Sequence, residues 1–263
     1  MAAQASNAPF MHLNPWMYPL LFFTGLAAGF VDAIAGGGGL ITVPMLLAAG
    51  LDPQVALGTN KLQSSCGTAL ALRHYARSGW IDWNELRPGL IASLVGALLG
   101  AVAVTRMNPA FLRPAIPVLL LAIAAYTALS PKMGSKAGPR RMSPIAFGLV
   151  FGLTLGFYDG FFGPGTGSFW TMACILVFGL DLLRATACTK AMNLMSNLAS
   201  LAVFVAAGKV DYGVGAAMAA GQMIGGRLGS GLAVKRGAGF IRPVFLTVVL
   251  TITARLLWQN LRR

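Results

Sequence analysis

The chain has 263 residues, of which 56% are hydrophobic and only 10% are charged, and its formal net charge is +13. Soluble domains carry about 25% charged residues, so this composition excludes an ordinary water-soluble domain. The basic residues lie mainly between apolar runs, where membrane proteins carry the charges that set their orientation, and no nucleic-acid-binding motif accompanies them. We therefore expect a protein surrounded by a lipid bilayer, with no nucleic-acid partner.

Eight apolar segments follow an N-terminal tail at residues 1–15, and a polar linker at 130–143 divides them into two groups of four. The first group, within 16–129, lies at 16–49, 53–76, 86–104 and 111–129. The second group, within 144–263, lies at 144–178, 182–207, 212–234 and 240–260. A membrane-spanning helix needs roughly 20 mostly apolar residues. The sequence therefore predicts an all-α, polytopic membrane protein.

The two groups repeat each other at an offset of 129 residues. Gly50-Leu51-Asp52 matches Gly179-Leu180-Asp181, and Lys61 matches Lys190. Upstream, with small gaps, Asp32 matches Asp159. Such a duplication in an apolar chain is typical of secondary transporters, whose substrate site lies between the two halves.

The first segment of each half is too long for one span and is interrupted by glycine. An unbroken helix over 16–49 would measure about 51 Å, against a hydrocarbon core of about 30 Å. We expect helix to be interrupted at the breaks, which are Gly36, Gly37, Gly38 and Gly39 in one half and Gly163-Pro164-Gly165-Thr166-Gly167 in the other. Each break could interrupt a single span, giving parallel repeats, or form a re-entrant hairpin, giving inverted repeats. We favour inversion.

Two lysines lie about 12 Å into their predicted helices, close to the middle of the membrane. Lys61 shares a helix face with Ser64 and Thr68, and the matched face in the second half carries Lys190, Asn193 and Asn197, with Asn60 beside the first lysine. An ammonium with hydroxyl and amide donors suits a small oxyanion. Backbone N–H groups at the breaks (Gly37, Gly38, Gly165 and Thr166) could add donors. Alternatively, each lysine snorkels or pairs with an aspartate to hold the halves together.

Asp32 and Asp159 open the two breaks. Each could take up a proton or coordinate Na⁺ as the coupling ion, or could cap the next helix or pair with a lysine. Arg227 breaks the symmetry, since its matched residue is Leu98. It could contact the substrate or pair with a carboxylate.

Enzyme chemistry finds no support in the sequence. There is no Ser-His-Asp set, no pair of catalytic carboxylates and no nucleotide-binding loop. The cysteines at 66, 174 and 188 form no Cys-x-x-Cys pair, so we expect neither a metal site nor a cofactor.

Several motifs resemble the TauE/SafE family of bacterial membrane permeases. They are Gly29-Phe30-Val31-Asp32 with the following glycines, Ala56-Leu57-Gly58-Thr59-Asn60-Lys61, Gly156-Phe157-Tyr158-Asp159, and Ala187-Cys188-Thr189-Lys190. The resemblance covers nearly the whole chain. It implies a multi-spanning permease with two related halves in the bacterial inner membrane, associated with export of sulfite, sulfoacetate or other organosulfur anions.

We therefore predict a permease for a small anion, driven by an ion gradient of H⁺ or Na⁺. An uncoupled anion channel and a non-transport scaffold or assembly factor are the alternatives. Transport predicts a central cavity reached by both lysines, whereas a scaffold predicts packed ion pairs with no cavity. The sequence leaves the substrate, the coupling ion and a homo-oligomer open.

Overall fold

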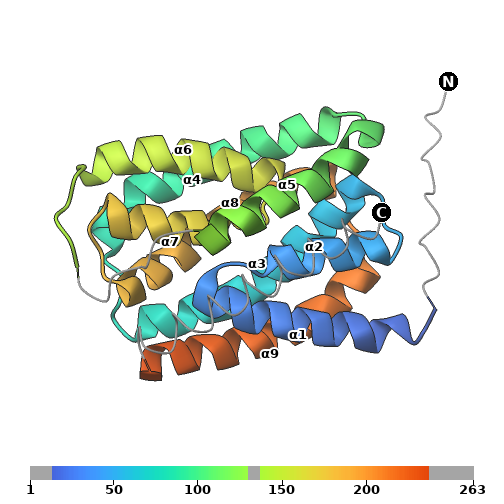
Figure 1. Ribbon diagram of the computed structural model, residues 1–263, viewed down its shortest axis with the longest axis horizontal. Coiled ribbons are helices and arrows are strands. Elements are labelled where there is room, and N and C mark those ends of the chain that lie inside the picture. Colours follow the sequence, from blue (N-terminus) through green and yellow to red (C-terminus); the bar gives the residue numbers. More distant parts are fainter. Residues whose placement is uncertain (1–13, 130–136, 237–263) are drawn as a thin grey trace.

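The computed structural model describes residues 14–129 and 137–236 (Figure 1). Within these ranges it contains helices and no strand, so the predicted all-α class is confirmed for the described part. The helices are α1 (Met17–Ala35), α2 (Gly39–Ala48), α3 (Pro53–Arg77), α4 (Trp83–Arg106), α5 (Pro109–Leu129), α6 (Pro144–Phe161), α7 (Thr166–Leu176), α8 (Leu182–Ala206) and α9 (Tyr212–Arg236). The segment predicted at 240–260 lies outside the described residues, as do residues 1–13 of the tail and 130–136 of the linker.

Helix is broken at both glycine-rich sites, as predicted. Residues 36–38 separate α1 from α2, and residues 162–165 separate α6 from α7. The backbone there is left-handed, with φ of 76° at Gly36, 97° at Gly163 and 84° at Gly165, which glycine adopts without steric cost. α2 has 10 residues and α7 has 11, so each rises only about 15 Å, roughly half of a hydrocarbon core.

Large apolar side chains cover much of the outer surface, and many polar side chains are buried. In the described part of the chain, α1, α4 and α6 are long and apolar enough to cross a membrane. They expose large apolar side chains, such as Phe23 (63% exposed) and Ile91 (67%). α3 and α8, with 25 residues each, are as long, but they carry many buried polar residues. This distribution suits a protein in lipid, where polar groups must find partners inside the molecule.

α9 packs in parallel against α1 and α3. A Cβ added to Gly25 would clash with the carbonyl oxygen of Met218, and one added to Gly29 would clash with that of Gln222. Gly67 of α3 faces the same Gln222. Because residue numbers rise together along α1 and α9, the two helices run in the same direction, and the glycines let their backbones approach closely.

α4 packs in the same way against α6. A Cβ at Gly96 would clash with the Leu153 carbonyl oxygen, and one at Gly100 with that of Phe157. These two helices are therefore also parallel. The contacts of α4 with α6 and of α1 with α9 are the most extensive between helices of the described chain.

α1 and α6 run in opposite directions. Gly58 near the start of α3 faces Lys209 just before α9, so α3 runs with α9 and hence with α1. α4 returns antiparallel to α3, since Gln54 at the start of α3 donates to the carbonyl of Val104 near the end of α4 (3.0 Å). α6 runs with α4. Figure 1 shows the result: α1 begins at the right of the view and α6 at the left.

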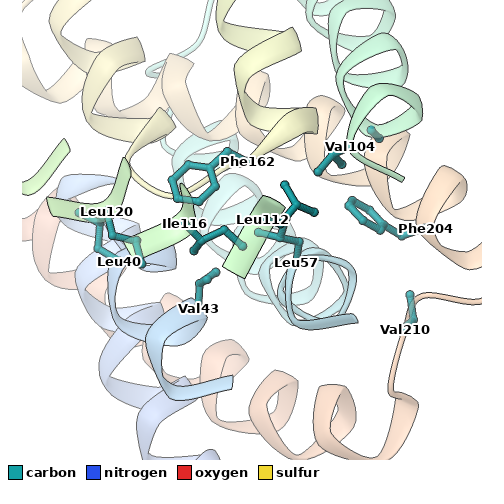
Figure 2. Packing of buried hydrophobic residues seen from close by; sticks show 11 residues of the cluster. Leu40, Val43, Leu57, Val104, Leu112, Ile116, Leu120, Phe162, Phe204 and Val210 are labelled. Atoms are coloured by element: carbon teal, nitrogen blue, oxygen red, sulfur yellow. The ribbon is translucent and has the colours of Figure 1, made fainter. Parts of the chain in front are cut away.

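A buried apolar cluster joins the two halves on one side of the molecule (Figure 2). Val43 of α2, Leu57 of α3 and Ile116 of α5 come from the first half, and Phe162 and Phe204 come from the second. The cluster packs against the start of α2 and the end of α6, and so supports both breaks from one side.

The described part of the linker is exposed, as its polar composition predicts, but it is also held in place. Gly138 N donates to Gly179 O (3.1 Å), and the Arg140 guanidinium pairs with the Glu85 carboxylate at 2.7 Å. These contacts tie the linker to the α7–α8 turn and to the start of α4, at the same end of the molecule as the turn between α3 and α4.

Candidate functional site

Two buried ion pairs connect the halves of the molecule reciprocally. Lys61 Nζ of α3 lies 2.7 Å from Asp159 Oδ1 at the end of α6. Lys190 Nζ of α8 lies 3.0 Å from Asp32 Oδ2 in the last turns of α1. Both lysines are almost fully buried, at 1% and 0% exposure. Each lysine thus pairs with the aspartate of the opposite half, at the positions that the sequence repeat matches.

The local structure explains where these charges lie. Asp32 and Asp159 both precede a break, so they occupy the C-terminal ends of α1 and α6, where the helix dipole disfavours an anion. A lysine from the opposite half offsets this charge. Lys190 Nζ additionally donates to the backbone carbonyl oxygen of Asp32, which lies in the last turns of α1.

The Asp159 carboxylate has the richer set of partners. Besides Lys61, it accepts hydrogen bonds from Thr166 Oγ1 (3.2 Å) and from Ser196 Oγ. Lys61 Nζ also donates to Asn197 Oδ1 at 3.2 Å. Charge-assisted hydrogen bonds of this kind are about twice as strong as neutral ones. The result is a closed network that joins α3, α6, α7 and α8.

The Asp32 carboxylate is held more loosely. It accepts from Lys190 Nζ and, at 3.4 Å, from the backbone N–H of Gly38. Its side chain is 14% exposed, whereas that of Asp159 is 5% exposed. Matched positions in the two halves therefore have unequal surroundings.

A small polar cavity of about 20 Å³ lies between the two carboxylates. Its lining includes most of the predicted site residues, namely Asn60, Ser64, Thr68, Asn193, Asn197, Gly165 and Thr166, together with Asp32 and Asp159. A cavity of this size holds about one water molecule, so the described conformation leaves no room for a larger anion at the site.

Five predicted residues do not border the cavity. Lys61 and Lys190 reach the carboxylates that line it, rather than the cavity itself. Gly37 and Gly38 lie in the adjacent break, where the N–H of Gly38 faces Asp32. Arg227 is also away from the cavity, because it is exposed on the outer face of α9. A transporter was expected to have a cavity, and a scaffold was expected to have packed ion pairs without one. The described structure has both ion pairs and a cavity.

The two breaks touch each other next to the cavity. A Cβ added to Gly167 would lie 2.5 Å from the Cα of Gly36, so the two backbones are in direct contact. Gly39, at the start of α2, packs against Pro164. α2 and α7 therefore both begin next to the cavity. The helix dipole favours negative charge at such ends.

Sequence reasoning missed two hydrogen bonds behind the cavity. Thr42 Oγ1 donates to Asn60 Oδ1 (2.5 Å), and Thr171 and Thr189 share a hydrogen bond of 3.1 Å. The same offset of 129 residues relates these pairs and could have revealed them. They fasten α2 to α3 and α7 to α8. Asn193 Oδ1, by contrast, is buried and has no hydrogen-bond partner among the described residues.

A helical protein that exposes apolar surface, buries polar groups and brings two broken helices together at its centre has the features of a membrane transporter. The chain belongs to the TauE/SafE sulfite exporter family, whose profile matches residues 21–256. It is 39% identical over 254 residues to the probable membrane transporter protein YfcA of Escherichia coli, covering 97% of this chain and 94% of that protein.

Two further relatives carry similar names. A probable membrane transporter protein of Haemophilus influenzae is 41% identical over 241 residues, covering 92% of this chain and 94% of the relative. The probable membrane transporter protein ORF9 of Sinorhizobium is 43% identical over 237 residues, covering 90% and 91%. No solved structure matches the chain. The protein is therefore a membrane transporter of the TauE/SafE family, and these names indicate a transporter rather than an enzyme.

Proposed function

We propose that the protein moves a small anion, such as sulfite, a sulfonate or a related organosulfur compound, across the membrane at the expense of an ion gradient. The observation that supports this most is the pair of reciprocal, buried Lys–Asp bridges beside a polar cavity where two helix breaks meet. The substrate class comes from the family description, "Sulfite exporter".

The anion would bind where the cavity now lies. An ammonium offsets its charge, the side chains of Ser64, Thr68, Asn193 and Asn197 donate to its oxygens, and the first turns of α2 and α7 add favourable dipoles. Since the closed cavity holds about one water molecule, binding requires the breaks to separate. The Asn193 amide can donate to the anion only from Nδ2, because its Oδ1, which is buried without a partner among the described residues, accepts hydrogen bonds.

Stability alone is a poor explanation for this arrangement. Replacing a buried ion pair by apolar residues of similar volume is often neutral or stabilising, so a scaffold has little need of two such pairs. Charges inside a membrane protein are costly, and in most cases they mark the path of a substrate or ion. The site therefore favours transport over a purely structural role.

The halves form inverted repeats of four apolar segments each in this proposal. The opposite directions of α1 and α6, and the reciprocal contacts of α1 with α9 and of α4 with α6, support inversion. In each half the broken helix pair enters and leaves the membrane on the same side, as a re-entrant hairpin. Three membrane-crossing segments follow it. Rocking of one repeat against the other would then expose the cavity to each side in turn.

The charge distribution supports a bacterial inner-membrane location with one orientation. Basic residues gather at the end that holds the α3–α4 turn: Arg73, Arg77, Arg87, Arg140, Arg141, Arg184, Lys235 and Arg236. The opposite end of the described chain carries Arg106, Arg113 and Lys209. Because Lys and Arg are enriched on the cytoplasmic side, the α3–α4 end faces the cytoplasm and α1 begins at the periplasmic side.

Cysteine labelling tests both inversion and orientation. Ser78 and Ala207 are matched by the repeat, and both are exposed at turns. A membrane-impermeant maleimide applied to intact cells should label Ala207→Cys and not Ser78→Cys, while both should react in lysed cells. The unsubstituted protein gives the background from its native cysteines. Labelling of both variants in intact cells would contradict the inverted arrangement.

Transport is tested in proteoliposomes with a panel of sulfite, a sulfonate, sulfate and acetate. We expect flux of a sulfur anion that responds to a pH or Na⁺ gradient. Lys190→Met should weaken anion binding by on the order of 2–5 kcal/mol, because it removes the charge and keeps the apolar stem. Lys235→Met, at an exposed helix end, is the matched control and should bind normally. Flux indifferent to both gradients would identify a channel, and normal flux in Lys190→Met would refute the anion site.

A further inference from the structure

We propose that the two matched ion pairs have different tasks: Asp32 takes up the proton that accompanies the anion and thereby releases Lys190 to it, whereas Asp159 holds Lys61 as a fixed joint. This inference rests on the proposed function and names its coupling ion and coupling residue.

This inference is argued from the different surroundings of the Asp32 and Asp159 carboxylates. Asp159 is enclosed and accepts from Lys61, Thr166 and Ser196. If Lys61 left, Asp159 would keep its hydroxyl donors, but both charges would lose their partner inside the protein. Among the described residues, the Asp32 carboxylate has one side-chain partner, Lys190, and a long contact to the Gly38 N–H, and its side chain is the more exposed of the two. Protonation of Asp32 therefore disturbs fewer hydrogen bonds to the carboxylate than protonation of Asp159 would, and the released Lys190 also leaves the backbone oxygen of Asp32.

Few charged or titratable groups compete with Lys190 for Asp32. From α3, the Tyr75 hydroxyl donates to the backbone oxygen of neighbouring Ala33. α2 and α7 contain no Asp, Glu, Lys, Arg or His. Charged residues of α9, the helix packed along α1, are exposed (Arg227, Lys235 and Arg236). Asp159 lines the far side of the same cavity. The protonation of Asp32 is thus linked mainly to Lys190 and to what fills the cavity.

Charge balance then requires the proton and the anion to arrive together. The cluster holds two lysines and two aspartates, so it has no net charge to attract an anion. A proton from the medium that adds to the Asp32 carboxylate removes one negative charge, and Lys190 keeps its own proton. The cluster gains one positive charge, which a monovalent anion neutralises. Anion and proton therefore cross together, one of each, without net charge movement.

Asp32→Asn is compared with Lys235→Met, a control substitution at the exposed end of α9. Methanesulfonate is the probe, since it stays singly charged at neutral pH, and the membrane potential is clamped at zero. With one proton per anion, a gradient of one pH unit should give about tenfold accumulation in the wild-type protein. Asp32→Asn should bind the anion and equilibrate it with no accumulation. Lys235→Met should accumulate it as the wild-type protein does.

A second measurement needs no substitution. Binding of methanesulfonate to the purified wild-type protein, followed by calorimetry in two buffers of different ionisation enthalpy, should show uptake of about one proton per anion. Binding without proton uptake would overturn the inference, as would gradient-driven accumulation that survives in Asp32→Asn. If the wild-type protein neither binds nor transports any anion of the panel, the proposed function itself fails, and this inference fails with it.

Discussion

Lys61 with Asp159 and Lys190 with Asp32 are counterparts in the two halves of the chain, yet they differ in their neighbours. Thr166, Ser196 and Asn197 add hydrogen bonds to the first pair. Among the described residues, the carboxylate of the second pair contacts only Lys190 and the Gly38 N–H, and Lys190 also donates to the backbone oxygen of Asp32. The position corresponding to Ser196 in the first half is Gly67, which has no hydroxyl to offer and instead packs against α9. The matched positions carry the same charges, and different residues around them make the pairs unequal.

This inequality separates two roles that a symmetric site would have to combine. A transporter needs a joint that survives the conformational cycle and a group that changes partner during it. An enclosed ion pair suits the first role because removal of one partner leaves an uncompensated buried charge. A partly exposed pair with few donors suits the second.

The largest expected effect follows from removing the enclosed lysine. Lys61→Met leaves the Asp159 carboxylate without its countercharge, which should destabilise the protein by about 3–5 kcal/mol. The apparent melting temperature in detergent should fall by roughly 10 °C. Lys190→Met should cost only roughly 1–3 kcal/mol, because Asp32 is less buried. Thermal melts of both variants at one protein concentration measure the difference.

A double variant separates lost charge from lost packing. Adding Asp159→Asn to Lys61→Met removes the unpaired carboxylate, so much of the lost stability should return. Equal melting temperatures for Lys61→Met and Lys190→Met would show that the two pairs are equivalent, and the comparison would then fail.

Much of the bundle could be predicted from the sequence because the repeat and the apolar segments are long-range patterns. Residues 36–38 and 162–165 interrupt helix as predicted, since the glycines there adopt backbone conformations that other residues avoid. The pairing of each lysine with the aspartate of the opposite half was foreseen only as an alternative to an anion site. The sequence could not decide between an ion pair and an anion site, because polar residues on one helix face do not indicate which residues face them from other helices.

Helix direction and the inequality of the pairs depended on tertiary contacts. The parallel course of α1 and α9 comes from glycines such as Gly25 and Gly29, whose partners lie almost 200 residues away. The two breaks meet at Gly36 and Gly167, which lie in different halves of the sequence. The placement of Arg227 could not be predicted either, since the sequence around an arginine in an apolar span does not indicate whether its side chain faces the interior or the lipid.

The next largest effect is expected where the breaks meet. Gly167→Ala places a Cβ 2.5 Å from the Cα of Gly36, and overpacking of this kind costs about 1–3 kcal/mol. Because the breaks must separate and close again, flux should fall roughly tenfold, in line with the same energy. Gly231→Ala is the matched control, since its Cβ would meet no atom within 4 Å. Flux that drops equally in both variants would show that the contact between the breaks is not the cause of the loss.

The smallest effect is expected at the charge that breaks the repeat. Arg227 is exposed on α9 beside Met223, Ile224 and Leu228, and its matched residue is Leu98. Arg227→Leu restores the repeat and removes a charge from an apolar face. Exposed substitutions usually change stability by less than about 0.5 kcal/mol, so anion flux should stay within about twofold of wild type. A loss as large as that of Lys190→Met would mean that the anion path extends to the outer face of α9, and the site would then lie across that helix as well as between the two ion pairs.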